Sequence, residues 1–105
     1  MRTEVETTDQ FQSIINSVDK NVLVFYQPSC LFCKWHMKRL DEQHSDIDYY
    51  AVDVTKWYDW YSENKYLKFS YPYTRIYRKG KSIFSIDGEL YALQINKLKK
   101  ALYNV

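Results

Sequence analysis

The apolar and polar positions in the first quarter of the chain predict a helix followed by a buried strand. Residues 7–18, TTDQFQSIINSV, begin with two candidate helix caps, Thr8 and Asp9. The apolar residues that follow recur at helical spacing: Phe11, Ile14, Ile15 and Val18. Residues 21–26, NVLVFY, then form a continuous β-branched and aromatic run, which is typical of a strand covered on both faces of a sheet.

The alternation of helical and strand patterns continues through the middle of the chain. From Cys30 onwards the apolar period is helical again, and one stripe of it carries Cys33, Met37, Leu40 and His44. Residues 48–54, DYYAVDV, predict a second buried strand. Residues 56–66, KWYDWYSENKY, predict a short helix, because three aromatic residues stand there at helical spacing: Trp57, Trp60 and Tyr61.

The last third of the chain predicts a hairpin and a closing helix. Residues 72–88, PYTRIYRKGKSIFSIDG, read as two strands joined at Lys79-Gly80. Residues 90–105, LYALQINKLKKALYNV, form an amphipathic pattern. We expect Ile95, Leu98, Ala101, Leu102 and Val105 to point inward and Lys97, Lys99 and Lys100 to point outward. The whole order predicts an α/β fold, in which parallel strands and an antiparallel C-terminal hairpin form a mixed sheet with helices on both faces.

Composition and charge narrow the function classes. With 105 residues, of which 46% are apolar, the chain is long enough for a hydrophobic core, and we expect one ordered domain over residues 1–105. The net charge of +2 is too small to argue for nucleic acid, and the basic run at 75–81 reads better as a strand end and turn. The polar N-terminus lacks a signal-peptide pattern, and the longest apolar run, residues 22–26, is too short to cross a bilayer. We therefore expect a monomeric cytoplasmic protein without a membrane partner.

The chain has two cysteines, Cys30 and Cys33, which could form a structural clip, part of a metal site or a reactive pair. A permanent disulfide is improbable in a reducing compartment, and a bridge over so short a loop adds little stability. A zinc shell would need further ligands, yet the chain has no second C-x-x-C and its two histidines are His36 and His44. We therefore expect no metal. We interpret His36 as an exposed helical residue in preference to a proton-transfer group, and His44 as a helix-end residue.

A reactive pair fits the position of the cysteines best. A C-x-x-C that follows a buried strand and opens a helix points to dithiol–disulfide chemistry. The helix N-terminus favours a thiolate at Cys30, and Lys34, one turn further on, adds a cation that stabilises it. Cys33 lies on the inward stripe and should be harder to ionise. Cys30 would then attack a target disulfide, and Cys33 would resolve the mixed disulfide.

Three segments of the chain resemble thioredoxin: VLVFYQPSCLFCK at 22–34, YAVDV at 50–54 and YPYTRIYRKGK at 71–81. The resemblance implies the thioredoxin fold and a cis Tyr71–Pro72 bond beside the dithiol, where the backbone of Tyr71 pairs with an extended substrate segment. It also implies a substrate groove, lined by Leu31, Phe32, Tyr71, Pro72, Asp87 and Gly88. It implies no bound cofactor beyond the redox-active disulfide. Electrons would come from NADPH through a thioredoxin reductase, and ribonucleotide reductase or oxidised cytoplasmic proteins would be partners.

The sequence departs from the thioredoxin pattern around the dithiol. Ser29 replaces the usual tryptophan, and Leu31-Phe32 replaces the usual Gly-Pro between the cysteines. The family's buried aspartate falls at Val24 and its lysine partner at Ala51, so the proton route to the resolving cysteine is missing as a side-chain pair. Water, or with less support His36, would have to take that proton.

The predicted function is a thioredoxin-like protein disulfide oxidoreductase, with two alternatives. The segment QPSCLFC at 27–33 also resembles glutaredoxin, although Ser70-Tyr71-Pro72 and Asp87-Gly88 match that family's glutathione site poorly. The other alternative is a binding module that docks a partner on the aromatic segment WYDWY at 57–61. These aromatics are better explained as cover for the core.

Overall fold

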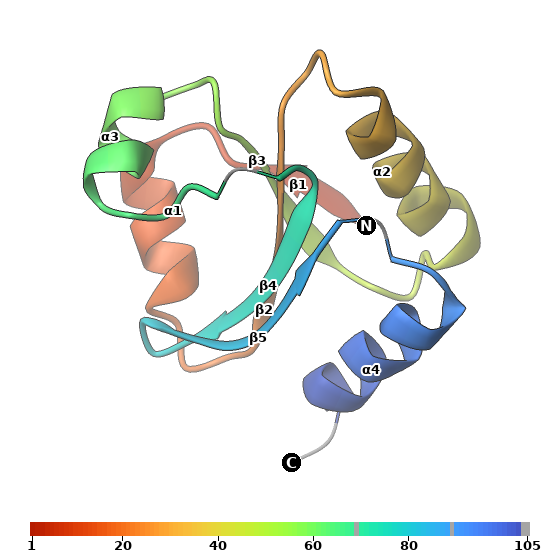
Figure 1. Cartoon of the computed structure of the whole chain (residues 1–105). Helices are drawn as coiled ribbons and strands as arrows, with labels where there is room; N and C mark the ends of the chain where they lie inside the picture. Colours follow the sequence, from red (N-terminus) through yellow and green to blue (C-terminus); the bar gives the residue numbers. More distant parts are fainter. Residues whose placement is uncertain (69, 89, 104–105) are drawn as a thin grey trace.

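In the computed structural model, which describes residues 1–68, 70–88 and 90–103, the centre of the protein is a five-stranded sheet (Figure 1). Its strands, in spatial order, are β1 (Arg2–Glu4), β3 (Tyr49–Asp53), β2 (Asn21–Tyr26), β4 (Tyr73–Arg78) and β5 (Lys81–Asp87). β3 runs parallel to both β1 and β2, whereas β4 is antiparallel to β2 and to β5. The predicted mixed sheet with an antiparallel C-terminal hairpin is confirmed.

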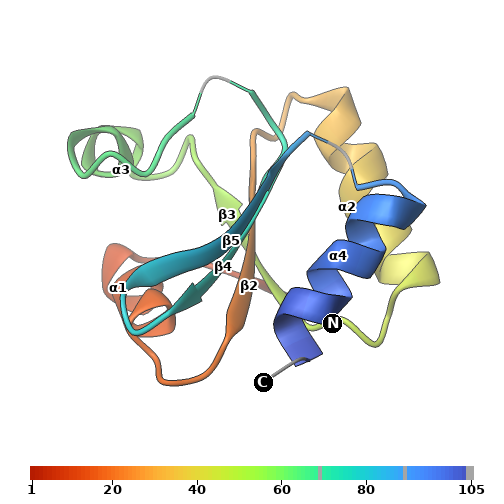
Figure 2. The ribbon, with the colours of Figure 1, turned by 60° about the horizontal axis from the view of Figure 1, so that its bottom comes forward.

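Helices cover both faces of the sheet (Figure 2). They are α1 (Thr8–Ile15), α2 (Leu31–Gln43), α3 (Tyr58–Glu63) and α4 (Ala92–Tyr103). α1 and α3 pack on one face and α2 and α4 on the other, because successive residues of β2 join two different core clusters. Leu23 and Phe25 point toward α1, and Val22 and Val24 point toward α2. This alternation explains why β2 is apolar at every central position.

The ring of Phe11 is the centre of the core on the α1 side. It is fully buried and meets four other aromatic rings edge-on, with centroids 4.9 to 6.1 Å away. Those four rings belong to Phe25, Trp60, Tyr61 and Tyr66. Edge-on aromatic pairs add to the free energy gained from burying the rings. Trp60 and Tyr61 therefore serve the core, as the sequence suggested, whereas Trp57 precedes α3 and is half-exposed.

Several boundaries differ from the sequence predictions. α1 ends at Ile15 with Asn16 as its C-cap, so Val18 lies in the following turn with 66% of its surface exposed, and its predicted place on the helix is wrong. The edge strand β1 was not predicted, because three residues of sequence RTE carry no apolar period. α4 begins at Ala92, two residues later than expected, and Val105, which was predicted to point inward, lies outside the described residues.

The two hairpin strands join at Lys79 and Gly80, as predicted. Both residues have positive φ, 51° and 79°, which is the geometry of a two-residue turn that matches the twist of the strands. The turn is also docked, since Lys79 N donates to Ser17 O at 2.8 Å and Gly80 N donates to Ile15 O at 2.7 Å. The φ of Gly80 favours glycine, and a Cβ there would stand 2.8 Å from Asn16 Oδ1, so the Asn16 side chain would also have to move.

Candidate active site

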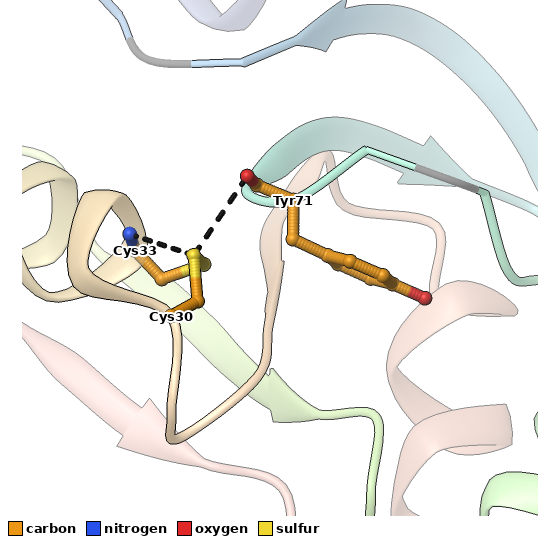
Figure 3. The surroundings of a disulfide bond; sticks show 3 residues. All are labelled: Cys30, Cys33 and Tyr71. Atoms are coloured by element: carbon orange, nitrogen blue, oxygen red, sulfur yellow. Dashed lines mark hydrogen bonds between the residues drawn. A yellow bond between two sulfur atoms is a disulfide. The ribbon is translucent and has the colours of Figure 1, made fainter.

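Cys30 and Cys33 form a disulfide at the N-terminus of α2, with their Cα atoms 5.2 Å apart (Figure 3). β2 ends at Tyr26, and the chain turns through Pro28 and Ser29 before the helix begins. Cys30 N donates to Gln27 O at 3.0 Å, which closes this turn. Cys30 is the N-cap residue of α2, and its backbone is extended, with φ −82° and ψ 113°. The strand-to-helix transition thus places the first cysteine where the helix leaves backbone N–H groups unpaired.

The two sulfur atoms have different surroundings. Cys33 N donates to Cys30 Sγ at 3.2 Å, so the first sulfur already accepts a hydrogen bond from the helix N-terminus. In the dithiol state this bond and the helix dipole stabilise a thiolate at Cys30. Cys30 is half-buried, whereas Cys33 is fully buried. A target disulfide can therefore approach Cys30, and Cys33 lies beneath it.

The loop before β4 lies against the first cysteine. The Tyr71–Pro72 peptide bond is cis, as the thioredoxin resemblance implies. The carbonyl oxygen of Tyr71 lies 3.8 Å from Cys30 Sγ, and its side chain points away from the disulfide (Figure 3). Pro72 is buried, and its carbonyl accepts a hydrogen bond of 2.8 Å from Gly88 N. The backbone of this loop is thus fixed beside the disulfide, and Gly88 is held against it.

The rim around the disulfide is apolar on the α2 side. Leu31 and Phe32 are 54% and 58% exposed, which leaves both predicted groove residues accessible to a partner. Trp35 is also half-exposed, and its ring meets the Phe32 ring edge-on at 5.6 Å. Trp35 was not among the predicted groove residues, although its position three residues after Phe32 places both rings on one side of the helix.

Asp87 and Lys34 lie further from the sulfur atoms. Asp87 is exposed at the end of β5, where its carboxylate pairs with Lys68 at 3.1 Å. Lys34 N donates to Cys30 O at 3.2 Å in the first turn of α2. The Lys34 side chain is exposed and lines a surface hollow that Asp41 also lines, so its predicted contribution to thiolate stability remains a prediction.

The floor beneath the cysteines is apolar, with one polar exception. Val24 and Ala51 are fully buried neighbours in adjacent strands. Thr74 stands opposite Val24 on β4 and is also fully buried. Its hydroxyl is 3.4 Å from His36 Nε2. The floor thus carries a neutral threonine–histidine pair beside the two apolar residues.

The expectation that His36 is an exposed helical residue is wrong, because its side chain is fully buried. Leu90 N donates to His36 Nδ1 at 3.4 Å, so Nδ1 is the acceptor and Nε2 carries the proton that faces Thr74. Burial, and secondarily the charge of Arg39, lower the pKa of His36 to about 4. The ring is therefore neutral near pH 7 and its one acceptor is occupied. His36 thus connects α2 with Leu90, which lies just before α4. Because its acceptor nitrogen is occupied, His36 is poorly suited to accept a proton from Cys33. His44 is the C-cap of α2, as predicted.

Within residues 1–68, 70–88 and 90–103, no three His, Cys, Asp or Glu side chains lie together as a potential metal site. In the same part of the chain, every helix is too short or too polar to cross a membrane.

Comparisons with known proteins agree with this geometry. The family model described as Thioredoxin matches residues 2–102. No curated protein sequence matches the chain significantly. Among solved structures, thioredoxin from Trypanosoma brucei brucei is similar at 21% identity and a TM-score of 0.73, over 95% of this chain and 89% of that one. Thioredoxin f from spinach chloroplast is similar at 16% identity and a TM-score of 0.77, over 95% and 85%. Thioredoxin from Malassezia sympodialis is similar at 22% identity and a TM-score of 0.71, over 96% and 86%.

At these identities the solved structures establish a shared fold, whereas the family match establishes membership of the family. It spans nearly the whole chain, including both cysteines and the cis-proline loop. Thioredoxins need no bound cofactor, because the cysteine pair itself carries the electrons. With its Cys30–Cys33 pair at the start of α2, the chain belongs to the thioredoxin family and is a thiol–disulfide oxidoreductase.

Proposed function

We propose that this protein reduces disulfide bonds in other cytoplasmic proteins and is itself reduced by NADPH through a thioredoxin reductase. The observation that carries the proposal is the contrast between a half-buried Cys30 at a helix N-terminus and a fully buried Cys33 behind it. The fixed backbone of the cis-proline loop supports it, since the loop offers an extended substrate a place beside the disulfide. Ribonucleotide reductase is included in the proposal as one target.

The reaction proceeds by two exchanges of sulfur bonds. The Cys30 thiolate attacks one sulfur of the target disulfide, so the Cys30–target bond forms while the target bond breaks and its second sulfur leaves as a thiolate. The Cys33 thiolate then attacks Cys30, forms the Cys30–Cys33 bond and releases the other target sulfur. Two electrons and, after protonation, two protons pass to the target.

Loss of the Cys33 proton is the difficult step of this reaction, because the residues beneath the cysteines offer no group to accept it. Val24 and Ala51 supply no ionisable group, and the acceptor nitrogen of His36 already takes the Leu90 N–H. Burial without a charged partner disfavours the Cys33 thiolate. We infer that water accepts this proton, and that general substrates are turned over slowly near neutral pH.

The test is reduction of insulin by the wild type and by single cysteine variants. Reduced wild-type protein should cleave insulin disulfides, and Cys30→Ser should abolish the activity. Cys33→Ser should attack once and accumulate a mixed disulfide that mass spectrometry detects. Equal insulin reduction by wild type and Cys30→Ser would remove the proposal. Regeneration is measured as NADPH consumption with a thioredoxin reductase, and recycling by glutathione in its place would favour the glutaredoxin-like alternative.

A further inference from the structure

A hollow of about 470 Å³ lies beside the disulfide on the side of α3. Its wall comes from three parts of the chain: the end of β2, α3 and the connection from α3 to the cis-proline loop. The residues that matter here are Gln27, Tyr58, Lys65, Lys68 and Tyr71. The apolar rim formed by Leu31, Phe32 and Trp35 does not contribute to it.

The hollow adjoins the reactive cysteine, although Cys30 itself is not part of its wall. Gln27 accepts the backbone N–H of Cys30 at 3.0 Å, and the Tyr71 carbonyl is 3.8 Å from Cys30 Sγ. Two wall residues therefore contact the cysteine that meets the substrate. A group bound in the hollow would belong to the same substrate segment as the disulfide under attack, or to its immediate neighbour.

The charge of the wall is positive. Lys65 and Lys68 line the hollow, whereas no Asp or Glu does. Within residues 1–68, 70–88 and 90–103, Lys65 has no carboxylate partner, and Lys68 pairs with the exposed Asp87 outside the wall. Lys68 Nζ also lies 5.9 Å from the centre of the Tyr73 ring, which restricts the position of its ammonium group.

The two acids of α3 lie on a different stripe of the helix from the residues that line the hollow. Tyr58 and Ser62, four residues apart, face the hollow and offer hydroxyl groups. Asp59 and Glu63, also four residues apart, are exposed and are not part of the wall. The wall thus combines the Lys65 ammonium, the Lys68 ammonium that Asp87 already pairs with, and neutral hydrogen-bonding groups.

We propose that this hollow binds a carboxylate of the substrate next to the disulfide that Cys30 attacks. The inference rests on the proposed function and names its substrate class: disulfides flanked by an acidic residue. The Lys65 ammonium attracts a carboxylate, Lys68 can exchange its exposed partner Asp87 for the same group, and hydroxyl groups of the wall can donate to it. An acidic side chain of a protein and a carboxylate of glutathione supply the same chemistry, so the experiment includes both sources.

The experiment mixes the pre-reduced protein with disulfide peptides and measures the second-order rate constant of its oxidation by acid quench and mass spectrometry. Two peptides are identical except that Glu or Gln stands on each side of one cysteine. Oxidised glutathione is the third oxidant. The variant is Lys65→Gln/Lys68→Gln, and the matched control is Lys97→Gln/Lys100→Gln, which removes the same charge from the exposed face of α4, across the sheet from α3.

The expected result for the wild type is a preference for the Glu peptide of about fivefold at low ionic strength, as for one partly screened ion pair. The preference should shrink in high salt and in Lys65→Gln/Lys68→Gln, and should persist in Lys97→Gln/Lys100→Gln. Faster oxidation by glutathione than by either peptide, lost in Lys65→Gln/Lys68→Gln, would support the carboxylate site with glutathione as its source.

Equal rates with the Glu and Gln peptides in the wild type would overturn the inference and leave the proposed function intact. A preference for Glu that survives in Lys65→Gln/Lys68→Gln would also overturn it, because the charge would then lie elsewhere. If no disulfide oxidises the reduced protein, the proposed function fails and the carboxylate site fails with it.

Discussion

Acidification should destabilise this protein through one buried side chain, His36. Its ring is fully buried, accepts the N–H of Leu90 and faces the Thr74 hydroxyl. In the unfolded chain the ring is exposed and takes up a proton at its ordinary pKa of 6.5, whereas in the fold its pKa is about 4. A protonated ring has no acceptor left at Nδ1, so the Leu90 N–H would lose its partner.

The sign and the size of the effect follow from this difference. Between pH 6.5 and 4 the unfolded chain binds a proton that the folded chain does not, so stability is full above pH 6.5 and falls as the pH drops toward 4. A tenfold difference in proton affinity is worth about 1.4 kcal/mol, and the loss should therefore approach about 3 kcal/mol. Small domains are stable by about 5 to 15 kcal/mol, so this one group removes a large share.

Urea unfolding at a series of pH values measures the loss. His36→Asn offers a side-chain oxygen in place of Nδ1 but cannot titrate, so its free energy of unfolding should fall less steeply than that of the wild type. The carboxylates contribute equally to both proteins and cancel in the difference. His44→Asn is the matched control at the end of the same helix and should keep the wild-type pH dependence. If the difference in unfolding free energy between the wild type and His36→Asn stays constant from pH 7 to pH 4, protonation of His36 does not destabilise the fold.

Three further predictions concern the dithiol and the core. Cys30 should have a depressed pKa, because the helix N-terminus stabilises its thiolate. At neutral pH, iodoacetamide should therefore alkylate Cys33→Ser, which keeps Cys30, faster than Cys30→Ser. The reverse order would make Cys33 the attacking cysteine and Cys30 the resolving one. The redox potential should be less reducing than about −270 mV, the thioredoxin value, because Phe32 replaces the family's proline, frees the helix start and lets the Cys30 thiolate of the reduced state be better stabilised. Equilibration with a glutathione series gives the midpoint, and a value at or below that figure would contradict this prediction. Phe11→Ala should lower the free energy of unfolding by about 3 to 5 kcal/mol, because the Phe11 ring is fully buried. The control Leu93→Ala, on the exposed face of α4, should lower it by about 0.5 kcal/mol or less. Similar urea midpoints for the two variants would show that the ring cluster contributes little to stability.

The strands that are buried on both faces could be predicted from the sequence almost to the residue. β2 and β3 are continuous apolar runs because helices cover the sheet above and below them. β1 could not be predicted in this way, since this edge strand of three polar residues joins the sheet through its pairing with β3 and has no apolar pattern of its own. Val18 fits the helical spacing of α1, but the chain leaves the helix before reaching it. Spacing alone does not mark that end.

The candidate site also has features that the local sequence predicts and features that only the tertiary structure creates. The dithiol could be predicted because Cys30 and Cys33 are close in sequence and stand between a strand and a helix. The burial of His36 could also have been predicted, since it stands three residues after Cys33 on the stripe that includes Met37 and Leu40. Because histidine is polar, its place on this apolar stripe was not interpreted as burial. The positive hollow could not be predicted, because Gln27 and Lys68 come together only through tertiary structure.

The docked turn of the β4–β5 hairpin restricts how the protein can be engineered. Hairpin tips usually accept inserted loops or reporter peptides, because their backbone groups face water. Here Gly80 N donates to the last carbonyl of α1, that of Ile15, Lys79 N donates to Ser17 O in the turn that follows, and Gly80 stands against the Asn16 side chain. An insertion at this tip would uncouple the end of a helix as well as the end of a hairpin. A fluorescent or affinity label is better placed at an exposed residue of α4, on the far side of the sheet from this turn.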